Sequence, residues 1–325
     1  MYEIGSPAYI NPDVVSHFDT LKIEETDKDR VYVSGCRGSS PPPTHKACIN
    51  LAGGFRNGME IIITGLDIEE KAKSFTDTLF KSLGGVEQFD EVSMELHQTQ
   101  KDNPSSNEEA MASLALSVKS MNPDLVGRMF SAKIIELSLA SYPGFFARSA
   151  FKANGPVIVY WPALVDSRHI KEIVYVDGKE IEVLPTNQLN LEEKYYQKEP
   201  IEILDALKGN SQLVHFGELY GTRSGDKGGC ANLGIWAKDD LSYSFLYEFL
   251  TVDKLKELLP DLSEFGIDRY ELSNIKSLNF YIHDILQDGI SSNNKKDGQA
   301  KSLGEYLRAK LIEVPKRILE GKKND

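Results

Sequence analysis

The stretch Gly221-Thr-Arg-Ser-Gly-Asp-Lys-Gly-Gly-Cys-Ala-Asn232 decides how the second half of this sequence is interpreted. It contains four glycines, two cations and one carboxylate, and it joins two β-prone segments, Gln212–Tyr220 and Ala231–Ala237. Glycines let successive main-chain N–H groups turn toward a bound anion, as in the nests that hold phosphates. The pattern therefore predicts a strand, a ligand-binding loop over Arg223–Gly229 and a returning strand.

The polar residues of this loop have defined chemical uses. Arg223 can bind a phosphate or carboxylate through two hydrogen bonds, and Lys227 can act as a point charge or, if its pKa falls, as a base. Asp226 can orient Lys227 or act as a base itself. Main-chain N–H groups for an anion would come from Gly225, Gly228 and Gly229. A structural hairpin loop closed by an Arg–Asp ion pair remains an alternative on sequence alone.

The segments after this loop predict a small two-layer domain. Thr251–Leu259 and Gln299–Leu311 have the spacing of amphipathic helices, whereas Arg269–Glu271 and Leu278–Ile285 have that of strands. With the two strands around the loop, the element order is ββαββα. That order places helices on one side of a small antiparallel sheet, in an α+β sandwich.

The first part of the sequence predicts a mixed-sheet α/β domain. Val31–Ser34 and Glu60–Thr64 are rich in β-branched residues and are predicted strands on either side of a Gly/Pro-rich connection, Gly35–Thr44. A helix is predicted to begin after Asp67 and to end at Gly84-Gly85, because its apolar residues recur every three to four positions.

Further elements of this part follow from local signals. Two more helices are predicted after capping residues, at Ser106 and at Asp124. Asp177-Gly178 is the dipeptide that a type I′ turn requires, so residues 171–183 are predicted to form a hairpin. Additional strands are predicted over Val92–His97 and Pro156–Tyr160.

The polar stretch Thr186–Asn210 separates the two parts and has no strong apolar face. We therefore predict a first domain over residues 1–186, a linker over 187–210 containing a short helix at Ile201–Lys208, and a second domain over 211–318.

The Gly/Pro-rich connection is a second candidate ligand site. Its three prolines, Pro41 to Pro43, form a semi-rigid wall, and the cations Arg37 and Lys46 on either side are positioned to meet an anionic substrate. The sequence alone favours a plain loop over this ligand site.

Composition excludes several classes of function. The chain has 325 residues, a net charge of -12 and a pI near 5.1, so we expect no nucleic-acid partner and no membrane partner. The three cysteines lack CxxC spacing and the six histidines lack HxxxH or HxH spacing, so no metal site is predicted. No nucleotide or dinucleotide motif occurs and no cofactor is predicted. A cytoplasmic location is the simplest expectation.

The residues of the second part resemble a known family pattern. Thr222–Gly229 with Asn232–Ala237, followed by Arg269–Glu271, Leu278–Phe280 and Asp297–Leu303, resembles the acyclic terpene utilisation (AtuA) family. The first part is similar to the same family through Tyr9–Val14, Gly35–Lys46, Gly65–Asp67 and Ala140–Gly144. The resemblance implies a ferredoxin-like fold for the second part.

The same resemblance sets expectations about function. Full family members are nearly twice as long, so the chain resembles a carboxy-terminal portion that lacks an amino-terminal α/β half. The family is associated with the catabolism of citronellol, geraniol and related acyl-CoA compounds. An anionic substrate such as a CoA thioester would suit the loop, and a carbonyl-activating role for Ser224 or Asn232 would be consistent with lyase or hydratase chemistry. We expect Asp226, Lys227 and Ser224 to be catalytic.

Three interpretations of function remain open on sequence alone. The chain is an enzyme, complete or in part, or a non-catalytic binding module that assembles with itself or with a separate amino-terminal chain, or a degraded remnant without activity. We expect a homo-oligomer or a complex with a partner chain.

Overall fold

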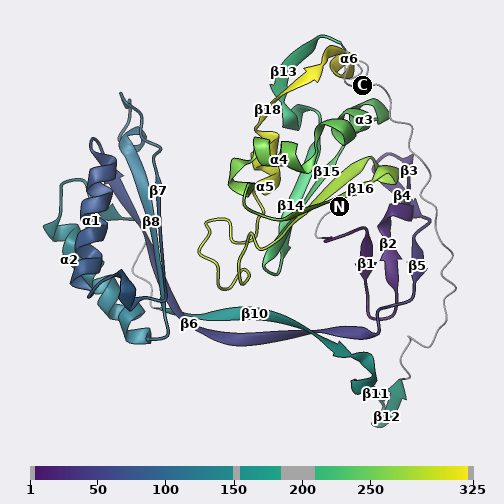
Figure 1. The fold of residues 1–325 in the computed structure, drawn as a ribbon, viewed down its shortest axis with the longest axis horizontal. Coiled ribbons are helices and arrows are strands. Elements are labelled where there is room, and N and C mark those ends of the chain that lie inside the picture. Colours follow the sequence, from purple (N-terminus) through teal and green to yellow (C-terminus); the bar gives the residue numbers. More distant parts are fainter. Residues whose placement is uncertain (1–3, 149–153, 184–208, 321–325) are drawn as a thin grey trace. The chain divides into compact units, whose positions relative to one another are not determined.

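The computed structural model describes residues 4–148, 154–183 and 209–320 (Figure 1). The chain divides into two compact units, Met1–Ile49 with Tyr160–Asp325, and Asn50–Val159. Two long strands, β6 (Thr44–Thr64) and β10 (Gly155–Asp166), run from one unit into the other. The predicted linker and its short helix lie almost entirely outside the described residues, so both stay predictions.

The first unit contains the ferredoxin-like domain. Its four-stranded antiparallel sheet has the order β14-β15-β17-β16. The strands are β14 (Gly221–Lys227), β15 (Cys230–Trp236), β16 (Ile267–Leu272) and β17 (Ser277–Ile282). The helices are α3 (Asp240–Phe249), α4 (Val252–Leu258) and α5 (Leu303–Arg308). The predicted ββαββα sandwich is confirmed, with two helices between the strand pairs where one was predicted.

One face of this sheet forms the core of the domain. Leu233 and Ile235 on β15, together with Leu278, Phe280 and Ile282 on β17, have exposed fractions of 0%. Because strand side chains alternate between faces, these residues all point to the side that the helices cover. The opposite side of the sheet, here called the outer face, carries the intervening residues.

A short two-stranded ladder extends the domain. β13 (Ser211–His215) pairs with β18 (Leu311–Pro315), which leads into α6 (Lys316–Glu320). The predicted strand Gln212–Tyr220 is therefore too long, because a capping box between His215 and Glu218 starts a 3-10 turn. The predicted helix Gln299–Leu311 is likewise reduced to the six residues of α5.

Small antiparallel sheets also belong to the first unit. They are formed by β1 (Ala8–Ile10), β2 (Val15–His17) and β5 (Arg37–Ser39), by β3 (Lys22–Asp27) and β4 (Arg30–Ser34), and by β11 (Glu172–Val176) and β12 (Lys179–Val183). Asp177 and Gly178 have φ values of 48° and 76°, as the predicted type I′ turn requires. The Gly/Pro-rich connection is not a plain loop, because β5 lies inside it.

The second unit is a sheet with helices on one side (Figure 1). Its strand order is β10-β6-β8-β7, and β9 (Phe146–Ala147) also pairs with β6. β7 (Glu91–His97) and β8 (Met111–Ser120) pair along seven residues. α1 (Ile68–Ser82) buries Ala72, Phe75 and Leu79 as predicted, and α2 (Phe130–Ala140) buries Phe130 and Ile134.

The helix predicted after Ser106 is wrong. Ser106 Oγ accepts a hydrogen bond from the Glu109 N–H at 3.3 Å, but only a 3-10 turn follows before β8 begins. Residues 111–118 of β8 alternate between half-buried and buried, which is the period of a strand. The predicted capping hydrogen bond at Ser106 therefore forms, but the apolar period of the following residues is that of a strand and not of a helix.

Candidate functional site

The Arg-Ser-Gly-Asp-Lys sequence is part of a regular β-hairpin. Seven cross-strand pairs join β14 to β15, from Gly221 opposite Trp236 to Lys227 opposite Cys230. Only Gly228 and Gly229 lie between the strands, and Gly228 has a φ of +64°. The prediction of a loop over Arg223–Gly229 is therefore wrong, because residues 223–227 belong to β14 and only Gly228 and Gly229 form a turn. The polar residues lie on a strand whose two faces have different environments.

Strand alternation separates the candidate residues into two groups. Ser224 and Asp226 lie on the face that α5 covers, whereas Arg223, Gly225 and Lys227 lie on the outer face. Asp226 and Lys227 were predicted as an acid–base pair. Their side chains leave the strand on opposite sides, and the Lys227 ammonium donates to the Asp226 main-chain oxygen at 2.7 Å.

Ser224 connects the hairpin to α5. Its exposed fraction is 4%, and its hydroxyl accepts a hydrogen bond from the Gly304 N–H at 3.0 Å and donates to the Lys301 carbonyl at 3.4 Å. A Cβ on Gly304 would lie 2.7 Å from Thr222 Oγ1, so the helix approaches β14 closely only because residue 304 is glycine. These contacts account for a buried serine structurally, and its catalytic role stays a prediction.

Replacing Ser224 with alanine tests the structural contribution. The buried Gly304 N–H would lose its acceptor, so we expect the free energy of unfolding to fall by about 1–2 kcal/mol. Urea unfolding monitored by tyrosine and tryptophan fluorescence measures the change. A variant as stable as the wild type would show that the hydroxyl does not hold α5, and would favour a role in ligand chemistry.

A cation that the sequence analysis did not select lies beside Asp226. Lys301 Nζ is 3.8 Å from Asp226 Oδ1. Asp297 fixes the main chain here by accepting hydrogen bonds from the N–H groups of Lys301 and Ser302, at 2.9 and 2.7 Å. Burial raises the pKa of Asp297, but the hydrogen bonds from Ser302 and Lys301 outweigh it and hold that pKa below its ordinary value. Nothing local in the sequence connects Lys301 to Asp226.

Glycines occupy several positions of the outer face around Arg223. Arg223 is exposed and stands directly opposite Gly234, while Gly225 stands opposite Asn232. Gly221 has no room for a side chain, because a Cβ there would lie 2.2 Å from the Trp236 ring. Glycine weakens a strand, and in this position it typically marks the close approach of a ligand or of another main chain.

Asn232 is buried within the same face. Its side-chain nitrogen donates to Asn279 Oδ1 at 3.2 Å, and Asn279 in turn donates to the carbonyls of Ile4 and Gly5. Both asparagines have exposed fractions of 0%. In this structure Asn232 therefore supports the outer face from within, and its predicted contact with a ligand stays a prediction.

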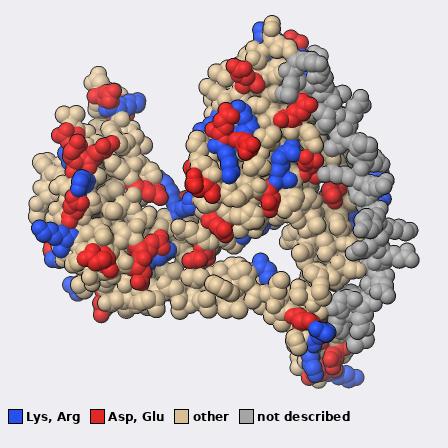
Figure 2. All heavy atoms as spheres, viewed as in Figure 1, with Lys and Arg blue, Asp and Glu red and all other residues tan. Residues whose placement is uncertain are grey.

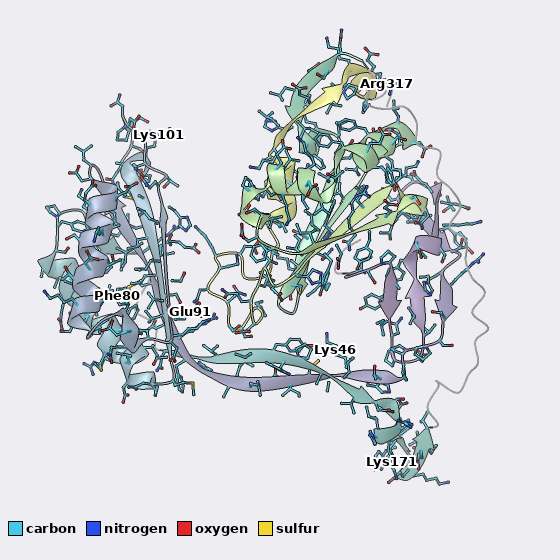
Figure 3. The ribbon with its side chains drawn as sticks, viewed as in Figure 1. Lys46, Phe80, Glu91, Lys101, Lys171 and Arg317 are labelled. Atoms are coloured by element: carbon cyan, nitrogen blue, oxygen red, sulfur yellow. The ribbon has the colours of Figure 1, made fainter. Side chains whose placement is uncertain are left out.

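The hairpin turn is enclosed by other parts of the first unit. The Leu286 N–H donates to the Gly229 carbonyl at 2.8 Å, and a Cβ on Gly229 would lie 2.0 Å from the Gln287 carbonyl oxygen. Gly228 packs against the Tyr160 ring. The Lys46 ammonium lies 5.5 Å from the centroid of the same ring, and Figure 3 labels this lysine on β6.

The structure thus brings together some of the predicted ligand-binding residues. Lys46 and Gly228 share the Tyr160 ring as a neighbour. Arg37 lies on β5, opposite His17, in a different sheet from the hairpin.

Two further residues near Lys227 were missed. Cys230 is the cross-strand partner of Lys227 on β15, and its Sγ accepts a hydrogen bond from the Asp284 N–H at 3.5 Å. Burial, together with a hydrogen bond to Cys230, raises the pKa of the Tyr281 phenol well above its ordinary value, so Tyr281 is protonated at neutral pH. A thiol and a phenol therefore lie beside the Lys227 end of the outer face.

Comparison with known proteins identifies the pattern. Residues 1–176 match the model of the acyclic terpene utilisation family protein AtuA, and residues 214–313 match the AtuA ferredoxin-like domain. The chain belongs to the AtuA family. No curated protein and no solved structure matches it. The ferredoxin-like match spans the hairpin, the outer face and α5 of this AtuA family member, and it confirms the expected family and fold.

The chain of this AtuA family member is acidic overall. The chain has a net charge of -12, and Figure 2 shows acidic and basic side chains interspersed over the face in view. In the described part of the chain no helix is long and apolar enough to cross a membrane.

Proposed function

We propose that the ferredoxin-like domain of this AtuA family member binds an anionic intermediate of acyclic terpene or branched acyl-CoA catabolism, in the form of a CoA thioester. The observation that carries the proposal is the arrangement of the outer face of β14. Arg223 and Lys227 project to the same side, with Gly225 between them and Gly234 opposite Arg223. Arg223 is exposed, whereas Gly225 and Gly234 are buried, so the two cations and not the glycines would contact a multiply charged ligand.

The chemistry of CoA fits these groups. A guanidinium binds phosphate bidentately, and an ammonium four residues along the strand adds a second point charge for another anionic group of the ligand. Trp236, 39% exposed and lying over Gly221, offers an aromatic surface on which an adenine ring can stack. These contacts support binding of the nucleotide part of the ligand and leave the acyl part unspecified.

An enzyme of lyase or hydratase type would also need a group that transfers a proton. Of the predicted pair, Lys227 shares the outer face with the proposed ligand, while Asp226 faces Lys301 on the covered side. We therefore assign proton transfer to Lys227 and an indirect role, through the position of the hairpin, to Asp226. Ser224 is proposed to position α5 and the hairpin.

A non-catalytic binding or assembly module is the second candidate. It is favoured by the main-chain contacts that Asn279 makes to Ile4 and Gly5, because they show that this face accommodates polypeptide. Exposed apolar residues on β4 support an oligomer or a partner chain: Val31 and Val33 are 60% and 55% exposed. Size-exclusion chromatography with light scattering tests that expectation.

Ligand binding tests the proposed function directly. We expect CoA and branched acyl-CoA thioesters to bind the full chain in isothermal titration calorimetry, and affinity to fall with rising salt. Replacing Arg223 with alanine should weaken binding about tenfold, since a charge-assisted hydrogen bond contributes about 1.5–3 kcal/mol. Arg30→Ala removes an exposed arginine from β4 and serves as the control.

Two outcomes would contradict the proposal. Binding that Arg223→Ala and Arg30→Ala weaken equally would place the ligand elsewhere. Absence of binding to any CoA compound, with dicarboxylates or polypeptides binding instead, would favour the second candidate.

A further inference from the structure

Two asparagines of the ferredoxin-like domain hold the N-terminal part of the chain by its main chain. Asn279, on β17, donates from Nδ2 to the carbonyls of Ile4 and Gly5, each at 3.2 Å. Asn274, just before β17, donates from Nδ2 to the carbonyls of Phe18 and Leu21, at 3.0 and 2.8 Å. Neither contact depends on the side chains of the residues held.

The burial of Asn279 makes its contacts energetically important. A carboxamide that is 0% exposed cannot exchange a lost partner for water, so its donors need acceptors within the protein. Its Oδ1 accepts from Asn232, which leaves Nδ2 to meet an incoming main chain. A buried amide at this position is therefore satisfied when the carbonyls of a polypeptide main chain lie against it.

Side chains add selectivity to this main-chain contact. Ile4 is 6% exposed, so an aliphatic side chain is buried where the segment meets the sheet. A Cβ on Gly5 would lie 3.3 Å from Cε2 of Tyr281. The surface therefore fits an aliphatic residue followed by glycine.

We infer that the outer face over β17 is a binding surface for a polypeptide segment, recognised by two successive carbonyls and by an aliphatic-Gly pair. In this structure Ile4 and Gly5 fill it from within the same chain. When that segment is released, the surface takes the same sequence supplied by a separate molecule. The inference goes beyond the proposed function and does not require an anionic ligand.

A peptide supplied in trans tests the inference. The probe is a fluorescent peptide with the sequence of residues 4–10, Ile-Gly-Ser-Pro-Ala-Tyr-Ile, blocked at both ends. The full chain carrying Ile4→Asp should release its own segment, because a carboxylate cannot be buried in an apolar site without a partner. We expect this variant to bind the peptide at least tenfold more tightly than the wild type in fluorescence anisotropy.

Matched variants identify the contact. In the Ile4→Asp chain, Asn279→Ala should weaken peptide binding about tenfold, the effect of about 1.4 kcal/mol of lost hydrogen bonding. Asn274→Ala removes the same chemistry from the contact with residues 18 and 21 and should change binding less than about twofold. A peptide in which valine replaces its glycine should bind at least tenfold more weakly.

Other results would overturn the inference. Equal binding to the wild type and to Ile4→Asp would show that the segment does not occupy the surface, and equal binding of the valine peptide would show that Tyr281 does not select glycine. If circular dichroism shows Ile4→Asp to be unfolded, Gly5→Val in the full chain releases the segment instead, and the same comparisons apply. CoA binding is measured separately, so failure of one proposal does not decide the other.

Discussion

Replacing Gly229 with alanine should lower the free energy of unfolding of the ferredoxin-like domain by about 3 kcal/mol. An added Cβ would lie 2.0 Å from the Gln287 carbonyl oxygen, far inside the distance that two such atoms tolerate. That oxygen belongs to the main chain, so it cannot rotate away as a side chain would. Either the hairpin turn or the segment after β17 must move, and the hydrogen bond from the Leu286 N–H to the Gly229 carbonyl is lost.

Gly155→Ala is the matched control for this substitution. Gly155 begins β10, and a Cβ there would have no atom within 4 Å. We expect its effect to stay within about 0.5 kcal/mol, as for most exposed positions. Urea denaturation of both variants gives the two values. Similar losses for both would show that the hairpin turn is not packed against residues 284–289.

The sequence predicts those elements whose apolar period is uninterrupted. α1 is one example, because Ala72, Phe75 and Leu79 recur on one face and Gly84-Gly85 supplies the positive φ values that end it. The ββαββα order is another, since the apolar residues of β15 and β17, Leu233 and Ile235 and then Leu278, Phe280 and Ile282, recur at every second position. Local signals are sufficient where burial and periodicity agree.

The predictions were wrong where polar residues suggested a loop or a helix cap in a segment that forms a strand. The Arg-Ser-Gly-Asp-Lys sequence has the composition of a loop, yet it forms β14 because β15 offers seven partners in register. A strand at the edge of a sheet needs few apolar residues of its own, so composition could not reveal it. After Ser106 a helix was predicted from the capping residues, but the alternation of half-buried and buried residues along β8 is that of a strand.

The candidate site depends on contacts that no local pattern encodes. Asp226 meets Lys301, and Asn279 meets Ile4, across long stretches of sequence. Side-chain types in the hairpin predicted the possibility of anion binding, but only the strand register shows which of them share a face. The register assigns these polar residues to two faces of the hairpin, and substitutions on the two faces are expected to have different effects on ligand binding and stability.

The double substitution of Arg223 with alanine and Lys227 with methionine should weaken binding of a CoA thioester about 100-fold. Each cation is expected to contribute at least about 1.4 kcal/mol through charge-assisted contacts to the same ligand. The free energy of unfolding should change by less than about 1 kcal/mol, because Arg223 is exposed and the methionine keeps most of the lysine stem. Calorimetric titration and urea unfolding of the same preparations measure both quantities.

Asp226→Asn separates the two faces of the hairpin in the same assay. Its carboxylate faces Lys301 on the covered side, so removing the charge should change ligand affinity less than about twofold while the outer-face double variant loses binding. If Asp226→Asn abolished binding as fully as the double variant, the ligand would have to reach the covered side, and the outer face would not be the site. If the double variant instead lost several kcal/mol of stability with binding intact, Arg223 and Lys227 would be structural residues of the hairpin.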